Sequence, residues 1–395
     1  MIQATSRHLQ LVCAVSLTTI VGQSVISPAL PTIRHALGVS PEQIGLVITA
    51  FTLPGIFFVP ITGVLADRYG RRRIMIPLLF LYGIAGAASG LAHDFETLLA
   101  LRFLTGIAAG SLGSLSIVLV VDYFSDRQRA RVFGIRMAIG QVGNATVPLL
   151  AGGLAVIGWQ YPFLLYGLAV PVGLYALHVM EKDRPEEGSK LGAYLARTFA
   201  GISSKRVLSL LTIPLSLTIV NHGINLTFIP ILMELSFNAS AVLIGVIVSA
   251  RVTMGAVFAF NMGRLAGRFG EIRLLYVSFA ALGLAFLITP LMPSVWWMLL
   301  PALLAGVNTG IAFPSFQTIL ARQAPEGSLA GVMAANSMTA RLGQTIGPLL
   351  AGLGFTLIGL DLVFVAAAVI VFAALIFLVF ALRRVQPAPA LAAES

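Results

Sequence analysis

The chain has 395 residues, of which 58% are hydrophobic and only 10% are charged. Soluble domains carry about 25% charged residues, so this composition excludes an ordinary soluble enzyme and predicts a protein that crosses a membrane many times. The net charge of +10 would suit nucleic-acid binding, but the basic residues lie in short segments between apolar runs, which favours a role in membrane orientation. The single cysteine, Cys13, excludes a disulfide framework or a cysteine-based metal site within one chain.

Apolar stretches follow one another along the whole chain, each near the roughly 20 residues that a spanning helix needs. The first could be mistaken for a signal peptide, but Pro28-Ala29-Leu30-Pro31 followed by charged residues does not look like a cleavage site, so we expect it to be the first span. The twelve predicted spans are 9–33, 44–66, 74–92, 97–121, 132–157, 161–180, 207–234, 241–263, 274–292, 297–320, 331–358 and 361–382.

The basic residues predict the orientation of these spans. With both termini in the cytoplasm, 20 of the 25 Lys and Arg residues fall on the cytoplasmic side and only Arg34 falls on the outer side. This asymmetry is the positive-inside pattern. Trp159, Trp296 and Trp297 then lie at outer ends, where interfacial indoles are common. We therefore expect a multi-pass protein of a bacterial-type plasma (inner) membrane.

The longest polar segment divides the spans into two groups of six. We expect an N-terminal six-helix half over 1–180, a cytoplasmic central loop over 181–206, and a C-terminal half over 207–395 that ends in a short cytoplasmic tail. The stretch 191–199 within the loop is either a solvated linker or an amphipathic helix on the inner membrane surface.

The two halves repeat each other with a shift of 200 residues. Residues 63–75 (GVLADRYGRRRIM) align with 263–275 (GRLAGRFGEIRLL), and Pro148-Leu149-Leu150-Ala151-Gly152 recurs as Pro348-Leu349-Leu350-Ala351-Gly352. Duplicated halves are a common plan among membrane transporters, with the substrate site between them near the bilayer midplane. The sequence therefore predicts an all-α membrane protein with twelve transmembrane helices in two pseudo-symmetric halves.

The loop between the second and third spans carries the motif Gly63-x-Leu65-Ala66-Asp67-Arg68-x-Gly70-Arg71-Arg72-Arg73. Gly63 would permit close helix packing and Gly70 a tight turn. This stretch resembles the loop 2–3 signature of the major facilitator superfamily, whose fold has twelve helices. The resemblance implies that the signature, with Asp67, Arg68, Arg71 and Arg73, forms a cytoplasmic gate latch in which Asp122 is a partner for Arg68.

Two further stretches resemble motifs of the same superfamily. Arg102-x-x-Thr105-Gly106 is similar to its second motif, which implies a role for Arg102 in proton coupling, although Thr105 replaces the usual glutamine. Alternatively, Arg102 extends its side chain to the outer surface. The run Gly140–Gly153 resembles the glycine-rich motif of the antiporter branch, with departures at Val147 and Ala151.

Together with Pro28-Ala29-Leu30-Pro31, this run makes the chain most like the twelve-helix drug:proton antiporter group. Pro148 and Gly152, and their counterparts Gly347 and Pro348, are expected to give kinked, closely packed helices.

Ionisable residues inside the membrane are the main candidates for function. Arg251 and Arg341 each lie about ten residues into a span, or roughly 15 Å deep at helical rise, and none of the 15 acidic residues is predicted at the midplane. An anionic substrate could supply the missing charge; alternatively, both arginines bond backbone carbonyls. Arg136 is expected to extend to the cytoplasmic surface.

Neutral polar side chains complete the predicted cavity. His222 is the only midplane group that titrates near neutral pH, so it is a candidate for proton coupling or, equally, a packing residue. The other cavity candidates, each of which could instead bond neighbouring helices, are Gln23, Ser27, Gln141, Asn144, Asn221, Asn225 and Gln344.

Three functions remain open from sequence. The first is a proton-coupled exporter of drugs or amphipathic metabolites that works by alternating access. The second is an organic-anion carrier, by symport or exchange, that uses Arg251 and Arg341. The third is a non-transporting receptor or assembly subunit. No catalytic triad, metal-ligand grouping or phosphate-binding loop is recognisable, so we expect no enzyme activity, cofactor or metal. The expected partners are a small-molecule substrate, protons and the lipid bilayer, with no nucleic acid, and the chain is expected to be a monomer.

Overall fold

A computed structural model describes residues 2–181, 205–323 and 329–382. Within these ranges all regular structure is helical. The elements are α1 (Ile2–Ser24), α2 (Ile26–Leu37), α3 (Leu46–Tyr69), α4 (Arg71–Ala88), η1 (Ser89–Leu91), α5 (Phe95–Tyr123), α6 (Asp126–Ile157), η2 (Tyr161–Leu168), α7 (Ala169–Val179), α9 (Lys205–Val220), η3 (Asn221–Phe228), α10 (Ile229–Phe237), α11 (Ala241–Phe269), α12 (Glu271–Ile288), η4 (Thr289–Leu291), η5 (Val295–Met298), α13 (Leu299–Gln323), α14 (Leu329–Ile358) and α15 (Leu360–Leu382).

These elements form twelve spans, because a chain inside a bilayer must satisfy its backbone polar groups within helices. Ten helices in the described ranges are each long and apolar enough to cross a membrane, and the bent pair α1 and α2, broken at an angle of 41°, brings the number to eleven. The remaining span is α14, which carries the polar residues Arg341, Gln344 and Thr345 in its middle. The expected central loop, with its stretch 191–199, lies outside the described residues.

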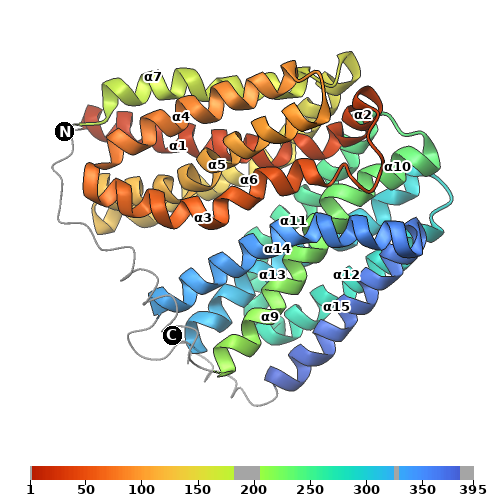
Figure 1. Cartoon of the computed structure of the whole chain (residues 1–395). Helices are drawn as coiled ribbons and strands as arrows, with labels where there is room; N and C mark the ends of the chain where they lie inside the picture. The colour runs from red at the N-terminus through yellow and green to blue at the C-terminus, as the bar shows by residue number, and fades with distance from the viewer. Residues whose placement is uncertain (1, 182–204, 324–328, 383–395) are drawn as a thin grey trace.

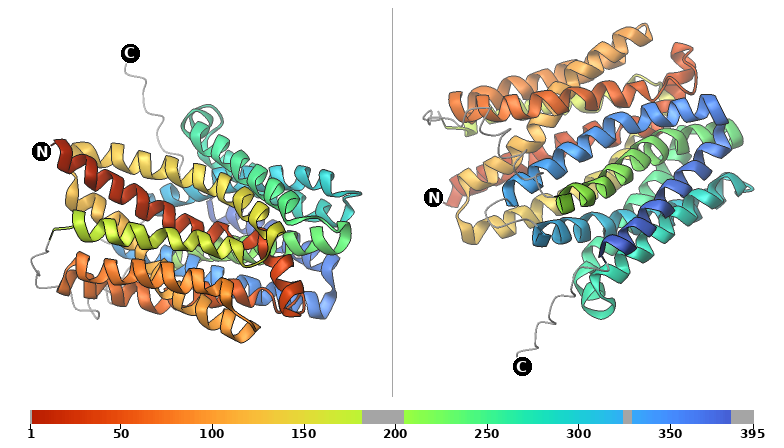
Figure 2. Two further views of the ribbon diagram at one scale, coloured as in Figure 1. Left: turned by 90° about the horizontal axis from the view of Figure 1, so that it is seen from above. Right: turned by 60° about the horizontal axis from the view of Figure 1, so that its bottom comes forward.

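The helices form two groups that meet at one end of the molecule. Figure 1 shows α1–α7 above and α9–α15 below, with the start of α1 and the end of α15 both away from the end where α2 and α10 lie. Both views of Figure 2 show that most helices run along one common direction. We call the end where α1 begins and α15 ends the terminal end, and the opposite end, where α2 and α10 lie, the far end.

The repeat seen in the sequence recurs in the packing inside each group. A Cβ atom added to Gly106 of α5 would collide with the carbonyl oxygen of Phe51 in α3, and one added to Gly306 of α13 would collide with that of Arg251 in α11. These contacts are related by the shift of 200 residues. The glycines allow α5 to pack closely on α3, and α13 on α11, as small residues do in membrane helix pairs. The two pseudo-symmetric six-helix halves are therefore confirmed.

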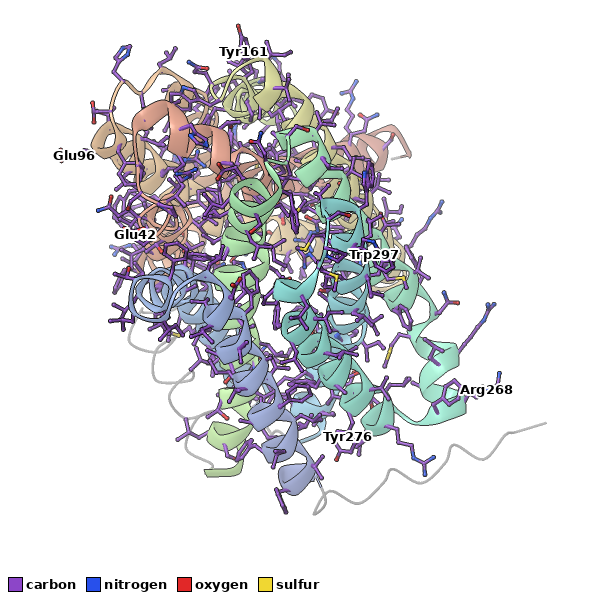
Figure 3. All side chains as sticks on the ribbon, turned by 90° about the vertical axis from the view of Figure 1, so that its right-hand side faces the viewer. Glu42, Glu96, Tyr161, Arg268, Tyr276 and Trp297 are labelled. Carbon is purple, nitrogen blue, oxygen red and sulfur yellow. The ribbon has the colours of Figure 1, made fainter. Side chains whose placement is uncertain are left out.

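The far end is closed by four repeat-related contacts between the halves. They join the residues just before α3 with α14, and α6 with α11. Each contact places a glycine against backbone of the other half; the pairs are Gly45 with Pro348, Gly245 with Pro148, Gly152 with Ala241, and Gly352 with Glu42. Figure 3 looks at this end of the molecule, with Glu42 labelled beside the C-terminal half. A larger side chain at these glycines would push the halves apart.

An ion pair also joins the halves at the far end. Arg34 of α2 donates two hydrogen bonds to the carboxylate of Glu234 in α10, at 2.9 and 2.8 Å, and His35 lies 2.7 Å from the same carboxylate. Arg34 and Glu234 are 200 residues apart and so occupy equivalent positions in the two repeats. Equivalent residues can touch only on the pseudo-two-fold axis, so this pair, which we call the axial ion pair, lies on that axis.

The terminal end is loosely packed by comparison. A Cβ atom added to Gly63 in α3, or to its counterpart Gly263 in α11, would meet no atom within 4 Å. The expected close packing at Gly63 is therefore not found in this conformation. Gly70 does form a sharp turn between α3 and α4, with φ of 98°, and Gly270 does the same at φ of 82°. Only glycine adopts such backbone angles readily.

Candidate substrate cavity

A cavity of about 220 Å³ lies between the halves, below the closed far end. Four helices of the N-terminal half (α1, α3, α5 and α6) and one helix of the C-terminal half (α14) supply its walls. The lining residues are Thr19, Ile20, Phe51, Thr52, Gly55, Gly106, Ala109, Gly110, Gly113, Arg136, Asn144, Arg341 and Gln344. Within the described part of the chain this lining contains two arginines and no carboxylate, so the described residues give it a positive electrostatic potential.

Arg341 reaches from the C-terminal half into the N-terminal half. Its Nη2 donates to the carbonyl oxygen of Gly110 at 3.4 Å. Cβ atoms added to Gly55 or Gly110 would each lie 2.9 Å from its Nη1. The missing side chains of these two glycines therefore provide the space in which the guanidinium lies.

Arg136 of α6 faces the same cavity. We expected it to extend to the cytoplasmic surface, but its Nη2 instead donates to Ser116 of α5 at 3.1 Å and its side chain lines the cavity. Its Nε is buried without a hydrogen-bond partner. The sequence interpretation failed because depth along a helix does not say whether a side chain turns toward lipid or toward a neighbouring helix.

A second cavity of about 390 Å³ continues from the first toward the terminal end. Gly55, Gly113 and Arg341 line both cavities. The other lining residues of the second cavity are Ile56, Val59, Pro60, Ser114, Ile117, Met333, Ser337 and Met338. None of the described residues that line this cavity is a carboxylate either. We call it the vestibule, because it connects the arginines with the loosely packed end.

The polar residues predicted for the cavity have different environments. Asn144 lines it and accepts a hydrogen bond from Ser24 of α1 at 2.8 Å, and Gln344 lines it from α14. Ser27 is buried and donates across the interface to the carbonyl oxygen of Leu226 at 2.8 Å, so it joins the halves instead. Gln141 lies in α6 and does not line either cavity. The side chain of Gln23 lies outside the described part of the chain.

His222 lies beside the main cavity. It belongs to η3, a π-helical segment between α9 and α10. It lines a side cavity of about 20 Å³ that shares Phe51, Thr52 and Gln344 with the main one. π-Helical segments often mark functional sites, and this one places an imidazole within reach of the cavity.

The expected pairing of Arg251 with Arg341 across one cavity is not found. Arg251 is buried in α11, where its Nη1 lies 3.4 Å from Oδ1 of Asn221, which also accepts from Asn225 at 3.1 Å. None of these three residues lines the main cavity or the vestibule. Arg341 and Arg136 are therefore the arginines that the structure brings together.

Arg102 does not extend to the surface, because it is completely buried in α5. Its Nη1 donates to the hydroxyl of Tyr166 at 2.7 Å, and that hydroxyl donates to the carbonyl oxygen of Gly22. The guanidinium lies over the rings of Phe51, Phe163 and Tyr166 at 4.6–5.3 Å. Such cation–π contacts stabilise a buried cation.

The loop motif forms a different ion pair from the one expected. Asp122, at the end of α5, pairs with Arg71 at 2.8 Å, whereas Arg68 lies over the ring of Tyr69. Asp67, near the end of α3, lies 3.6 Å from Arg71, the first residue of α4. Arg73 is exposed to solvent. The charged residues of the motif therefore contact one another at the terminal end of α4, but the arginine that pairs with Asp122 is Arg71 and not Arg68.

The glycines of α3 and α5 are the site residues that sequence reasoning missed. Gly55 and Gly110 carried no expectation from sequence, and Gly106 carried one only as part of the Arg102 motif, yet all three line the cavity, and Gly55 and Gly110 leave space for Arg341. Their spacing, together with that of Gly113, was an available signal, because small residues every few positions mark a helix surface that another group approaches closely. No group of three or more potential metal ligands is found among the described residues.

Twelve helices in two repeat-related halves around a central cavity define a membrane transporter of the duplicated type. The sequence profile of the Major Facilitator Superfamily matches residues 12–221 and again 208–395. The chain belongs to this family, whose members transport small molecules.

Individual relatives share the architecture at moderate identity. The probable sulfoacetate transporter of Cupriavidus necator is 30% identical over 194 residues, which are 48% of this chain and 44% of the relative. The chain thus spans less than half of that protein's length. The class C tetracycline resistance protein of Escherichia coli is 28% identical over 346 residues, 82% of this chain and 85% of the relative. A bacterial homologue of the lysosomal transporter Spinster, solved in an inward-facing and unoccupied conformation, superposes with a TM-score of 0.79 at 18% identity, covering 96% of this chain and 97% of that one.

Proposed function

We propose that this protein is a secondary transporter that exports small amphipathic compounds from the cytoplasm by alternating access. The observation that carries the proposal is the cavity between the halves, closed at the far end and continuous with the vestibule toward the terminal end. The tetracycline resistance relative, which aligns over most of both chains, supports export. The positive-inside pattern supports a cytoplasmic terminal end, so the conformation described here is inward-facing.

Proton coupling forms part of this proposal. His222 lines the side cavity next to Phe51 and Gln344 and is the coupling candidate that the geometry favours. Arg102 is a weaker candidate, because its guanidinium is enclosed by aromatic rings and Tyr166. The plasma membrane of a bacterial-type cell, which carries a proton gradient, would be the location.

Everted membrane vesicles with an imposed proton gradient test this function. A compound that the protein exports should enter the vesicles and partly collapse the gradient, as followed with a pH-sensitive dye; tetraphenylphosphonium and phenylacetate are the two probes. Vesicles without the protein are the background control. Absence of both accumulation and gradient collapse, for cations and anions alike, would contradict proton-coupled export.

Alternating access is tested by locking the far end. With Cys13→Ser as the background, cysteines replacing Arg34 and Glu234 can be joined by a short, cleavable bifunctional thiosulfonate. Transport should stop after cross-linking and resume when the linker is reduced. Each single-cysteine variant, treated in the same way, is the matched control. Transport that continues at full rate with the linker in place would refute the mechanism.

A second candidate function, an organic-anion carrier, is favoured by a specific observation. Arg136 and Arg341 line one cavity whose lining includes no carboxylate. The probable sulfoacetate transporter, one of the relatives, supports this candidate over its shorter aligned region. In the same vesicles, uptake of radiolabelled phenylacetate but not of tetraphenylphosphonium would favour the anion carrier over the exporter of cations.

A further inference from the structure

We propose that Arg136 and Arg341 form a binding site for the oxyanion group of the substrate, a carboxylate or sulfonate, and that the rest of the substrate is small and largely apolar. The inference deepens the second candidate function and rests on it. It replaces the pair expected from sequence, Arg251 and Arg341, by a pair whose members come from different halves.

The first argument is electrostatic. Two guanidinium groups line a cavity of about 220 Å³ between membrane helices, where the effective dielectric constant is far below that of water. Their mutual repulsion raises the free energy of the empty site, and no carboxylate in the lining of this cavity or of the vestibule offsets it. An oxyanion placed between them would add two attractive interactions, which together outweigh the one repulsion.

The second argument is the hydrogen-bonding capacity of the two arginines. A guanidinium has five N–H donors in a planar fork that fits an oxyanion at two points. Arg136 uses one Nη to reach Ser116, while its Nε is buried without a partner. Arg341 is held against Gly110 by a long contact of 3.4 Å, which a charged acceptor would readily outcompete.

The third argument concerns the remainder of the cavity, which suits a small organic body. Phe51 and Ile20 offer apolar surface, and Asn144 and Gln344 offer neutral amides at the same level. The vestibule provides a route from the terminal end lined by Met333, Met338 and small residues without acidic groups. An anion that enters by this route would therefore meet no negatively charged side chain among the described lining residues before it reached the arginines.

The two arginines come from different halves, so a motion of one half relative to the other changes the geometry of the site. Arg136 belongs to α6 in the N-terminal half and Arg341 to α14 in the C-terminal half. A bound oxyanion would bridge the halves within the cavity, below the closed far end. When the halves rock, the distance between these two arginines changes, so anion affinity must differ between the two states of the transport cycle, which is what coupling of binding to motion requires.

The test is binding of matched probes to the purified full-length protein in nanodiscs, measured by calorimetry. Phenylacetate and benzylsulfonate should bind, whereas benzylammonium, of similar size and opposite charge, should not. Arg136→Gln and Arg341→Gln should each weaken anion binding roughly tenfold or more. Arg268→Gln removes an exposed charge at the terminal end and should leave affinity within about twofold. Arg251→Gln should also leave affinity within about twofold, because Arg251 does not line the cavity.

A second variant keeps the inference testable if removal of an arginine harms folding. Asn144→Asp retains the acceptor for Ser24 but places a carboxylate in the cavity beside both arginines. It should abolish phenylacetate binding with no loss of thermal stability. Anion binding unchanged in Asn144→Asp, or lost in Arg251→Gln but not in Arg136→Gln, would overturn the proposal. Because binding is measured without a gradient, its failure is distinct from a failure of export.

Discussion

The axial ion pair should hold the far end closed and thereby set the balance between the two states of the transporter. Arg34 and Glu234 have side chains only 13% and 12% exposed, and two hydrogen bonds of 2.9 and 2.8 Å join them. Exposed ion pairs contribute about 0–1 kcal/mol, whereas removing one partner of a buried pair costs about 3–5 kcal/mol. The low exposure places the axial ion pair between these limits, near about 2–3 kcal/mol.

Glu234→Gln removes the charge and keeps one acceptor oxygen, so roughly half of that energy, about 1.5 kcal/mol, should be lost. Since about 1.4 kcal/mol corresponds to a factor of ten in an equilibrium constant, the population with an open far end should rise roughly tenfold. The exposed His35 contacts the same carboxylate, so we would compare the proteins in a His35→Gln background, where only Arg34 contributes a charge.

Spin labels at Leu91 and Leu291 would report this shift. Both side chains are exposed, at 75% and 73%, and they occupy equivalent positions in the two repeats. With Cys13→Ser as background, double electron–electron resonance should show a longer distance gaining population in Glu234→Gln. The exchange of both charges, Arg34→Glu with Glu234→Arg, should restore the original distribution. A distribution unchanged in Glu234→Gln and also in Arg34→Gln would refute the reasoning.

Three further outcomes follow from the packing and the loops. Gly152→Leu should force the far end open, because its side chain would collide with the carbonyl of Ala241; the same spin labels check this, with Gly153→Leu, at a position with open space, as the control. Arg102→Met should destabilise the protein by about 3 kcal/mol, through loss of the charged hydrogen bond to Tyr166 and the cation–π contacts, yet leave anion affinity unchanged; denaturant titration and calorimetry separate the two effects. The backbone N–H of Thr97, with its hydroxyl, lowers the pKa of Asp94 below the ordinary 3.8. The stabilisation from Asp94 should therefore be complete above that pH and disappear as the pH falls through the lowered pKa; in Asp94→Asn this pH dependence of the melting temperature should be absent.

The fold could be predicted from the sequence because the sequence patterns that determine it are periodic or local. Apolar length predicts a span, and the shift of 200 residues predicts two similar halves, as Gly106 and Gly306 show in their equivalent contacts. Gly70 and Gly270 were predictable for the same reason, since a positive φ favours glycine regardless of what lies nearby.

The site was less predictable, because the direction of a side chain depends on which helix lies next to it. Counting residues gave the depth of Arg251 and Arg136, but not that the first turns toward Asn221 within its own half while the second turns into the cavity. For Arg341, a position lining the cavity was anticipated, whereas its neighbours Gly55 and Gly110 have no side chain from which the contact could be predicted. Contacts across the halves are not periodic in the sequence, so no repeat analysis reveals them.

Comparison of equivalent positions explains how a symmetric scaffold can hold an asymmetric substrate. Positions that pack against backbone are alike in both halves, as at Gly152 and Gly352. Several positions that carry the charges have diverged: Arg136 corresponds to Asn336, Gln141 to Arg341, and Phe51 to Arg251. A larger residue at a packing glycine would separate the helices, so glycine is needed at the equivalent position of both halves. The cavity residues are free of that constraint, and both cavity arginines have come to lie against α5, on one side of the axis. A substrate with one charged end and one apolar end has the same lack of symmetry, which is why we assign its anionic group to the α5 side of the cavity.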